Sequence, residues 1–487
     1  MDTRLAGKAR EAGILLHPTS LPGEGAFGEL GPEALRFIDF LHAAGQTIWQ
    51  VLPLGPVHED MSPYQSLSAF AGNPALIGRD WLIEMLAELP DWQADWAHLP
   101  KADLIGHCRT YALQHPTLRD EFDSFCQAQA SWLGDYAEFM CLKQRFSQAG
   151  WFDWPVAYRD RELAAMQALT EANSDVLDGF RVEQFLFYRQ WQRVRDYASE
   201  HGIRILGDMP IFVAYDSVDV WACRDAFLLD ESGHATVVAG VPPDYFSATG
   251  QHWGNPHYDW EWMEADDFKW WHWRVAQYLE LFDLFRIDHF RGFEACWEIP
   301  AWEETAVNGR WIKVPGDALF ASLKQGFAEL PIIAEDLGII TEEVTALRKK
   351  YDLPGMLILQ FAFDSGPDNP YLPHNHTVDS VVYTGTHDND TTMGWYHSLD
   401  ERRRALVVEY LAHPADPMPW ALIDAAYASV ARMAIIPMQD VLELGSEHRM
   451  NIPGVAQGNW RWRFQWEQLA SEQAGRLKAL CERYGRG

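Results

Sequence analysis

The sequence predicts an α/β fold, a closed (β/α)8 TIM barrel with large, mainly helical insertions. Eight short apolar segments, helical patterns between most of them, and carboxylates at the ends of three of them support this prediction. The segments are rich in Ile, Val, Leu or aromatic residues and end in polar residues, Pro or Gly, as short buried strands do. They span residues 13–17, 47–52, 203–209, 284–289, 331–335, 356–363, 380–387 and 434–441.

Helical patterns separate most of the strand segments. In residues 32–44, Pro32 suits a first turn and apolar residues recur near one face. Residues 342–351 follow Thr341, which is a candidate N-cap. A repeated strand and helix favours parallel pairing through right-handed crossovers. Eight such units close a barrel whose chemistry belongs on the loops after the carboxyl ends of the strands.

Two connections are too long to be ordinary loops. Residues from about 54 to 202 contain amphipathic stretches such as 180–197, so we expect an inserted, mainly helical subdomain that flanks the cleft. Residues from about 211 to 283 form a second insertion, which carries an aromatic, exposed loop at 240–256. We expect residues 1–487 to form one catalytic barrel, ending in a helix over 466–484 without a separate C-terminal β-domain.

The composition excludes several classes of function. The chain carries 70 Asp and Glu against 39 Lys and Arg, a net charge of −31, so a nucleic-acid backbone or an anionic membrane would be repelled. Six cysteines lack the spacing of a zinc site, and no apolar run has the length of a signal peptide or membrane span. We therefore expect a cytoplasmic protein without a metal.

Three carboxylates lie at the ends of the fourth, fifth and seventh strand segments, namely Asp288, Glu335 and Asp388. Retaining glycosyl transfer needs a carboxylate nucleophile and a carboxylic acid roughly 5 to 5.5 Å apart. The short Asp288 suits a fixed nucleophile, and Glu335 on the next strand reaches further, toward the oxygen of the bond that breaks. Asp388 would face both across the rim, where it could hold sugar hydroxyls and stabilise a cationic sugar.

Basic residues accompany these acids. Arg286 lies two residues before Asp288 on the same strand face, so it can keep that carboxylate ionised, while repulsion between the acids keeps a proton on Glu335. His387 could bind the same sugar as Asp388. The alternative is that Arg286, Asp288 and His289 form only a buried ion-pair network. Three acids at matching strand ends favour catalysis.

The motifs around the acids, taken in order, resemble a known family. They read RIDHFRGF at 286–293, AEDLG at 334–338 and GTHDND at 385–390. The likeness covers nearly the whole chain and includes residues 13–22, 49–56, 62–66, 207–214, 240–256, 449–454 and 458–463. This set resembles the 4-alpha-glucanotransferases, also called amylomaltases or disproportionating enzymes, of glycoside hydrolase family 77.

The resemblance implies a role for each matching residue. Asp288 would be the nucleophile, Glu335 the acid/base and Asp388 the transition-state stabiliser, in agreement with the assignment from the residues alone. Asp208 would either contact the substrate or orient Arg286. The other implied substrate contacts are Arg286 and His387 in the donor subsite, Tyr64 near the cleaved bond, and Tyr245, Phe246 and Trp253 on the acceptor side. For the aromatic residues, simple packing is the alternative.

The implied reaction transfers a segment of an α-1,4-glucan to the 4-hydroxyl of glucose or another maltooligosaccharide. It proceeds by double displacement through a covalent glycosyl-enzyme. One α-1,4 bond replaces another, so no cofactor is expected, and no GxxxxGK[ST] phosphate loop is present. Two alternatives remain open: an α-glucan hydrolase with the same acids, and a non-catalytic glycan-binding barrel. The aromatic loop at 240–256 would favour transfer by excluding water.

Overall fold

The computed structural model describes residues 10–89, 92–243, 247–455 and 457–487. Within these residues, eight parallel strands form one sheet in the order β10-β11-β12-β1-β2-β3-β6-β9. The two ends of the sheet meet where the amide of Ala334 donates to the carbonyl of Pro354 at 2.9 Å. The predicted (β/α)8 barrel is therefore confirmed. The strands are β1 (Glu11–Leu15), β2 (Ile48–Gln50), β3 (Arg204–Met209), β6 (Leu284–Ile287), β9 (Ile332–Ala334), β10 (Gly355–Ile358), β11 (Ser380–Tyr383) and β12 (Met433–Pro437).

The barrel strands are buried on both faces, which explains their nearly continuous apolar sequences. Successive side chains of a strand point to opposite faces. Leu15, Ile48 and Leu284 belong to an apolar cluster formed by residues of the barrel strands and of loops at the rim. Ile14 and Trp49, their neighbours in sequence, belong to the larger core that the surrounding helices cover. The interior is thus a packed core that holds the strands, and their ends, in place.

Several strands end earlier than the sequence predicts. β10, β11 and β12 end at Ile358, Tyr383 and Pro437, four or more residues before the predicted boundaries. The apolar residues that follow remain buried, but in a 3-10 turn at Leu359–Phe361 and a short helix, α17 (Met438–Val441). Hydrophobicity marks burial in both cases, so it cannot show where a strand gives way to the rim.

The helices between strands largely follow the sequence pattern. α1 spans Pro32–Ala43, and α13 spans Glu342–Lys350 with the Thr341 side chain accepting from the amide of Val344. The last helix, α18, begins only at Ser471, because a separate 3-10 turn precedes it. The remaining helices outside the first insertion are α9 (Val218–Ala222), α10 (Trp260–Ala265), α11 (Lys269–Leu281), α12 (Gly316–Gly326), α14 (Thr392–Ser398), α15 (Glu401–Tyr410), α16 (Trp420–Ala428) and α18 (Ser471–Tyr484).

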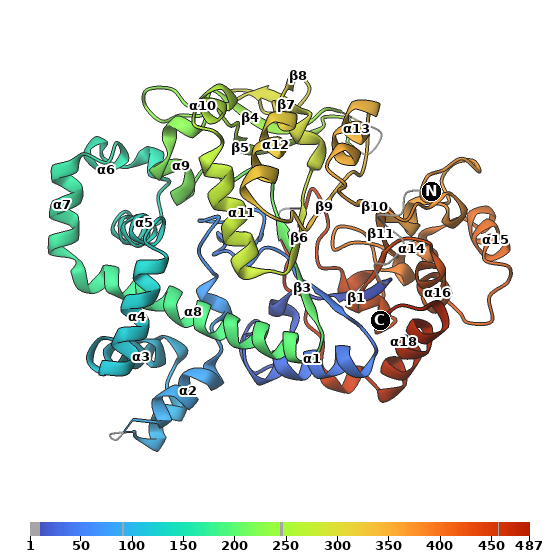
Figure 1. The fold of residues 1–487 in the computed structure, drawn as a ribbon, viewed down its shortest axis with the longest axis horizontal. Helices are drawn as coiled ribbons and strands as arrows, with labels where there is room; N and C mark the ends of the chain where they lie inside the picture. The colour runs from blue at the N-terminus through green and yellow to red at the C-terminus, as the bar shows by residue number, and fades with distance from the viewer. Residues whose placement is uncertain (1–9, 90–91, 244–246, 456) are drawn as a thin grey trace.

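The connection between β2 and β3 is helical and extends to one side of the barrel, at the left of Figure 1. Its longest helix, α8, packs against α3, α4 and α5 and then runs back to β3. The boundaries of a subdomain here stay a prediction. The helices are α2 (Arg79–Ala87), α3 (Lys101–Gln114), α4 (Pro116–Ala128), α5 (Leu133–Arg145), α6 (Val156–Arg159), α7 (Leu163–Ala172) and α8 (Ser174–Glu200).

A second, antiparallel sheet lies above the barrel in Figure 1 and was not predicted. Its strands are β4 (Val237–Val241), β5 (Gln251–Pro256), β7 (Ala295–Pro300) and β8 (Arg310–Lys313), in the order β5-β4-β7-β8. The sheet joins the connections on both sides of β6. The predicted loop at 240–256 therefore begins and ends in paired strands, with Gly240 opposite His252. Its glycines and prolines suggested a loop, whereas Gly240 is needed because a Cβ there would meet the Gln251 carbonyl oxygen at 2.1 Å.

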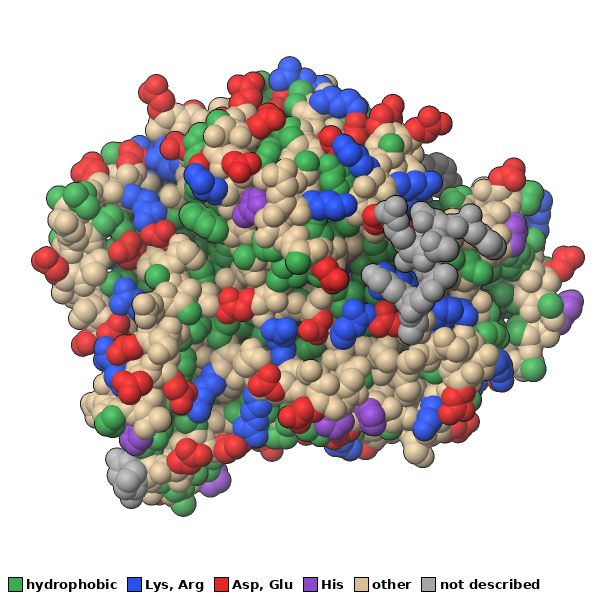
Figure 2. Space-filling model, viewed as in Figure 1, with side chains coloured by type: hydrophobic (Ala, Val, Ile, Leu, Met, Phe, Trp, Pro, Cys, Tyr) green, Lys and Arg blue, Asp and Glu red, His purple; other side chains and the backbone are tan. Residues whose placement is uncertain are grey.

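The surface carries no extended region of one charge on the face in Figure 2, where acidic and basic side chains alternate. Among the described residues, no helix combines the length and apolar character needed to cross a membrane. The described residues after β12 form no further strand, and a single β-bridge joins Arg486 to Arg10.

Candidate active site

Parallel strands bring their carboxyl ends to one rim of the barrel, and the predicted acids lie there. Asp208 pairs in register with Arg286 across β3 and β6, and Arg286 pairs with Ile333 of β9. Beyond the strand ends, the amide of Phe290 donates to the carbonyl of Glu335 at 3.0 Å. The register therefore places the residues that follow β6 beside those that follow β9.

Arg286 connects two of the acids. Its Nε donates to Oδ1 of Asp208 at 3.0 Å, and its Nη2 donates to Oδ1 of Asp288 at 2.6 Å. Burial lowers the pKa of the guanidinium, but Asp208 and Asp288 outweigh burial and hold it well above its ordinary value. Arg286 is therefore a permanent cation that fixes one oxygen of Asp288.

Asp208 differs from the other acids because it is fully buried. Its side chain is 0% exposed, compared with 33% for Asp288 and 46% for Asp388. Both carboxylate oxygens already have partners, since Oδ1 accepts from Arg286 and Oδ2 accepts from the Tyr64 hydroxyl at 2.7 Å. Of these three acids, only Asp288 and Asp388 present surface that a sugar can reach.

Asp288 and Glu335 are held together by a backbone turn. His289 has a φ of 53°, so the chain turns directly after Asp288. The turn directs the His289 amide to Oε2 of Glu335 at 2.7 Å, while the Leu337 amide donates to Oε1 at 2.9 Å. The turn that follows β6 therefore orients the carboxyl of Glu335 and keeps it beside Asp288.

The two carboxyls have raised pKa values. Burial and then the charge of Asp288 raise the pKa of Glu335 to about 8, against smaller opposing effects of Arg286 and the two amides. Burial raises the pKa of Asp288 to about 6, with Arg286 opposing this effect and Asp208 and Asp388 adding to it. At neutral pH, the pair therefore holds one proton, and that proton resides on Glu335.

Asp388 is the ionised member of the site. Burial raises the pKa of its carboxyl, but His387 and a hydrogen bond from Asn451 outweigh burial and hold it well below its ordinary range. Nε2 of His387 lies 3.3 Å from Oδ2, and Nδ2 of Asn451 donates to Oδ1 at 2.7 Å. Asp388 is thus a fixed negative charge at the open side of the rim.

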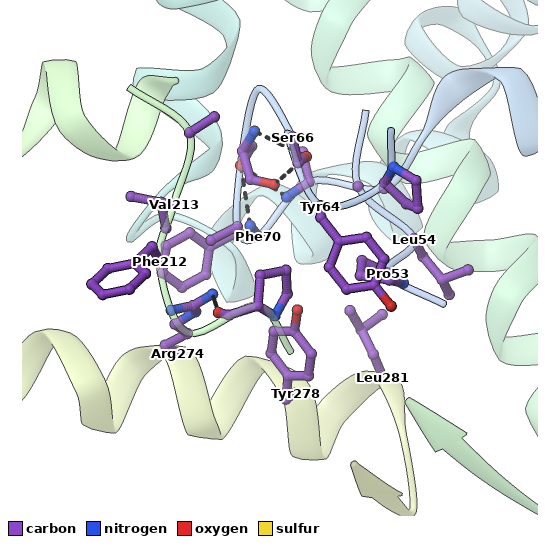
Figure 3. Close-up of a pocket in the computed structure, with 18 of the residues that line it drawn as sticks. Pro53, Leu54, Tyr64, Ser66, Phe70, Phe212, Val213, Arg274, Tyr278 and Leu281 are labelled. Carbon is purple, nitrogen blue, oxygen red and sulfur yellow. Dashed lines mark hydrogen bonds between the residues drawn. The ribbon is translucent and has the colours of Figure 1, made fainter. Parts of the chain in front are cut away.

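Tyr64 links the buried and open parts of the site. Its hydroxyl proton goes to Asp208, so the same oxygen must accept from Nε2 of His387 at 2.8 Å. The ring stacks on His387 with centroids 5.3 Å apart and planes inclined by 12°. Figure 3 shows Tyr64 at the edge of a pocket formed by parts of residues 53–72, residues 210–214 and α11. The contacts with Asp208 and His387 fix the position of the Tyr64 side chain beside this pocket.

Trp253 is the described member of the predicted acceptor-side aromatics. It lies on β5, where its ring meets His289 at 4.9 Å, perpendicular, and Phe212 at 6.4 Å. The second sheet thus places Trp253 against His289, the residue that follows Asp288. Tyr245 and Phe246 lie outside the described residues.

Two further residues complete the site. Asn451 binds Asp388, and Trp460 places its ring 5.9 Å from that of Tyr64 and 6.0 Å from that of His387. Trp460 has a φ of 64° and donates its amide to the Met450 carbonyl at 2.8 Å. Their motifs, RMNIPG and GNWRWR, contributed to the resemblance, but neither residue follows a predicted strand directly, so the sequence did not single them out.

The site can donate and accept a proton beside an ionised carboxylate, with a third acid fixed as an anion. Within the part of the chain that the structure describes, no group of three or more His, Cys, Asp and Glu side chains is placed to hold a metal ion. The groups in the site are those that retaining glycosyl transfer requires.

Comparison with known proteins agrees with this geometry. The family model for 4-alpha-glucanotransferases, glycoside hydrolase family 77, matches residues 16–469. The 4-alpha-glucanotransferase of Thermus thermophilus is 49% identical, over 97% of this chain and 98% of the relative. The chloroplastic/amyloplastic 4-alpha-glucanotransferase of Solanum tuberosum is 46% identical, over 98% of this chain and 86% of the relative.

Solved structures give the same result. The structure of an amylomaltase from Streptococcus agalactiae in complex with acarbose is 37% identical, with a TM-score of 0.93, and covers 98% of this chain and 100% of that chain. An amylomaltase from Corynebacterium glutamicum shares the fold at a TM-score of 0.74 and 15% identity, over 97% of this chain and 75% of that chain. The chain therefore belongs to the 4-alpha-glucanotransferases of glycoside hydrolase family 77, retaining enzymes that exchange α-1,4-glucosidic bonds.

Proposed function

We propose that Asp288 is the nucleophile and Glu335 the acid/base in this reaction. Asp288 attacks the anomeric carbon of an α-1,4-glucan, and the bond from that carbon to the leaving 4-oxygen breaks as Glu335 gives this oxygen its proton. A new glucan 4-hydroxyl then attacks the glycosyl-enzyme, Glu335 takes its proton, and Asp288 leaves. The observation that carries these assignments is the different binding of the two neighbouring carboxyls, Asp288 by the Arg286 guanidinium and Glu335 by two backbone amides. The raised pKa of Glu335 supports it.

Asp388 and His387 are proposed to bind the donor sugar. The low pKa of Asp388 keeps a negative charge beside the reacting carbon, where it stabilises a cationic sugar. The exposed part of the Asp388 side chain makes this contact accessible. Tyr64 is proposed to pack against the sugar with its ring edge, since its hydroxyl is occupied by Asp208 and His387.

Arg286 and Asp208 are proposed to act through other residues. Arg286 holds Asp288 ionised and oriented, while buried Asp208 orients both Arg286 and Tyr64. Asp208 therefore serves as a positioning residue rather than as a sugar contact. This favours one of the two roles that the sequence left open.

The acceptor is proposed to be glucose or a maltooligosaccharide, bound on the side of Trp253. Its indole is partly exposed and is anchored against His289, which places an apolar surface beside Asp288. Such a surface binds a sugar face and displaces water from the glycosyl-enzyme. Tyr245 and Phe246 are proposed to add to it. We also propose a cytoplasmic location, since all six cysteines are free thiols, as is usual in a reducing compartment.

Incubation with maltotriose tests the reaction directly. Transfer should yield glucose and a ladder of longer maltooligosaccharides while the total number of reducing ends stays constant. Hydrolysis would raise the number of reducing ends steadily, and a binding protein would leave maltotriose unchanged. A steady rise in reducing ends would overturn transfer as the reaction, because a hydrolase can use the same acids. Unchanged maltotriose would overturn the catalytic roles themselves.

A further inference from the structure

The barrel closes beside Glu335, and this closure differs from the other strand pairs. The sheet order ends at β9 and β10, while every neighbouring pair within it is a regular parallel ladder. At the closure, the amide of Ala334 donates to the carbonyl of Pro354 at 2.9 Å. The next bond toward the rim uses a side chain, because the amide of Met356 donates to Oδ1 of Asp336 at 2.7 Å. A carboxylate thus replaces a backbone acceptor where the barrel closes.

The surroundings of Asp336 are built for this bond. A Cβ at Gly355 would lie 2.4 Å from Oδ2 of Asp336, so the carboxylate reaches β10 only because residue 355 is glycine. Nε of Arg348, from α13, lies 3.0 Å from Oδ2 of Asp336. The Arg348 side chain is 10% exposed and the Asp336 side chain is 15% exposed. Arg348 also donates to the Leu353 carbonyl at 2.7 Å. Strand β10, helix α13 and the segment after β9 therefore meet at one carboxylate.

Glu335 is fixed on its other side by β6. Its amide donates to the Ile287 carbonyl at 3.0 Å, and its carbonyl accepts from the Phe290 amide. The main chain at 335 is thus tied to β6, while the adjacent side chain at 336 is tied to β10. A shift of the main chain that carries Glu335 requires that one of these two attachments yields, and such a shift would move the carboxyl away from the amides of His289 and Leu337.

We propose that Asp336 is a positioning residue for Glu335, which it holds in place by closing the barrel between β9 and β10. This inference depends on the proposed acid/base role of Glu335. The alternative is that the ion pair of Asp336 with Arg348 contributes only to stability. The two differ in whether loss of the Asp336 bond changes catalysis beyond its effect on folding.

Charged groups on the neighbouring elements determine how the pKa of Glu335 should respond when the Asp336 bond is lost. Asp288 and Arg286 of the β6 segment act on Glu335, while Arg348 of α13 acts on Asp336, and Tyr371 after β10 lies near both acids. Loosening the closure admits water to Glu335, and hydration lowers the pKa of a carboxyl that burial has raised. The alkaline limb of the pH–rate profile, where Glu335 loses its proton, should then move to lower pH.

The test compares Asp336→Ala with Asp336→Asn in the full chain. For Asp336→Ala we expect kcat on maltotriose to fall about 10- to 100-fold, as for a catalytic group misplaced by about 1 Å, with KM nearly unchanged. The alkaline limb should move by about one pH unit toward acid, as water reaches the carboxyl. Asp336→Asn should recover most of kcat, because its amide oxygen still accepts from Met356.

Asp283 provides a matched control at the opposite end of the barrel. It accepts from the strand amide of Ile205 at 2.7 Å and pairs with Arg195 at 3.4 Å, which repeats the pattern of Asp336 away from the rim. Asp283→Ala should lower the melting temperature while kcat and the alkaline limb stay as in the wild type. If Asp336→Ala behaves in the same way, Asp336 is only a structural residue.

Gly355→Ala keeps the proposal testable if Asp336→Ala does not fold. It retains Asp336 but pushes the carboxylate away from β10, so the same loss of kcat at unchanged KM is expected. Wild-type kcat in a folded Gly355→Ala protein would overturn the proposal. Glu335→Gln distinguishes failure of the acid/base role of Glu335 from failure of the positioning role of Asp336. Wild-type activity in Glu335→Gln would refute the acid/base role. Wild-type kcat in Asp336→Ala would refute only the positioning role.

Discussion

At the scale of single residues, the site separates two nearby carboxyls by their environments. Asp288 is bound directly by the positive charge of Arg286, whereas Glu335 accepts from two neutral amides and faces the charge of Asp288. Mutual repulsion makes double ionisation unfavourable, so one proton is retained on the carboxyl that Arg286 does not bind directly. The same arrangement would supply both the proposed nucleophile and the proposed acid at neutral pH.

Replacement of either carboxyl by its amide tests this division. Asp288→Asn removes the nucleophile and Glu335→Gln removes the transferable proton, so glucan exchange should fall at least about 1,000-fold in each variant. Each amide has nearly the same shape as its carboxyl, so folding and maltooligosaccharide binding should persist. Transfer assays beside calorimetric titration measure both properties. Wild-type activity in either variant would refute its assigned role.

The pH dependence of kcat/KM should be bell-shaped. Activity needs Asp288 ionised, so it should fall as the pH drops through about 6, the raised pKa of that carboxyl. It also needs Glu335 protonated, so it should fall as the pH rises through about 8. The two limbs belong to the interacting pair rather than to either residue alone. Initial rates on maltotriose between pH 4 and pH 10 give the profile, and constant activity above pH 9 would contradict the assignment of Glu335.

At the scale of elements, the second sheet positions the acceptor side of the site. β4 and β5 form a hairpin whose second strand carries Trp253, and β7 holds that hairpin from its other edge. The amide of Ala306, between β7 and β8, also donates to the carbonyl of Thr249 at 3.1 Å. A sheet of paired strands, rather than an isolated loop, therefore supports Trp253.

Gly240→Ala should disturb this support. The new Cβ would meet the Gln251 carbonyl oxygen at 2.1 Å and Ile299 Cδ1 at 2.6 Å, so β4 and β5 must separate and Trp253 shifts with β5. The share of hydrolysis in maltotriose turnover should rise, because water then reaches the glycosyl-enzyme more easily. Gly366→Ala, where no heavy atom lies within 4 Å of the added carbon, is the control. An unchanged ratio of new reducing ends to transfer products would argue against this role of the sheet.

At the scale of the whole molecule, the two ends of the barrel have different tasks. The carboxyl ends of the strands carry the chemistry, while the amino ends are closed by hydrogen bonds between distant segments. Arg486 is 3% exposed and donates to the carbonyls of Glu11, Tyr427, Ser429 and Ala431. It thereby joins β1, α16 and the segment between α16 and β12 on the side opposite the acids.

Arg486→Ala should therefore reduce stability without changing the chemistry. Loss of the buried guanidinium opens a cavity and removes a donor from four carbonyls, of which those of Tyr427 and Ser429 keep a donor in Arg10, so the free energy of unfolding should fall by about 2 kcal/mol or more. Arg483→Ala is the control, because its side chain is 62% exposed and its ion pair with Asp424 lies at the surface. Thermal denaturation should separate the two variants, while both should retain wild-type kcat. A lowered kcat in folded Arg486→Ala would show that the two ends are coupled.

Much of this architecture could be predicted because its signals are local. Each barrel strand is a short apolar run, and Asp288, Glu335 and Asp388 each follow one, so parallel pairing alone brings them to one rim. The second sheet could not be predicted, because β4 and β8 are short and contain polar residues or glycine, and because β4 pairs with β7 from another connection. The boundaries of β10, β11 and β12 were missed because the rim residues after them are also buried.

The sequence by itself determined the barrel and the position of Asp288, Glu335 and Asp388 at one rim, because apolar patterning and strand ends are properties of neighbouring residues. Only the tertiary structure decided the partners of these acids. Tyr64 meets Asp208 and His387, and Asn451 meets Asp388, across separations of 63 to 323 residues. Such contacts depend on how the barrel closes and on the register of each strand, and no local pattern encodes those distances.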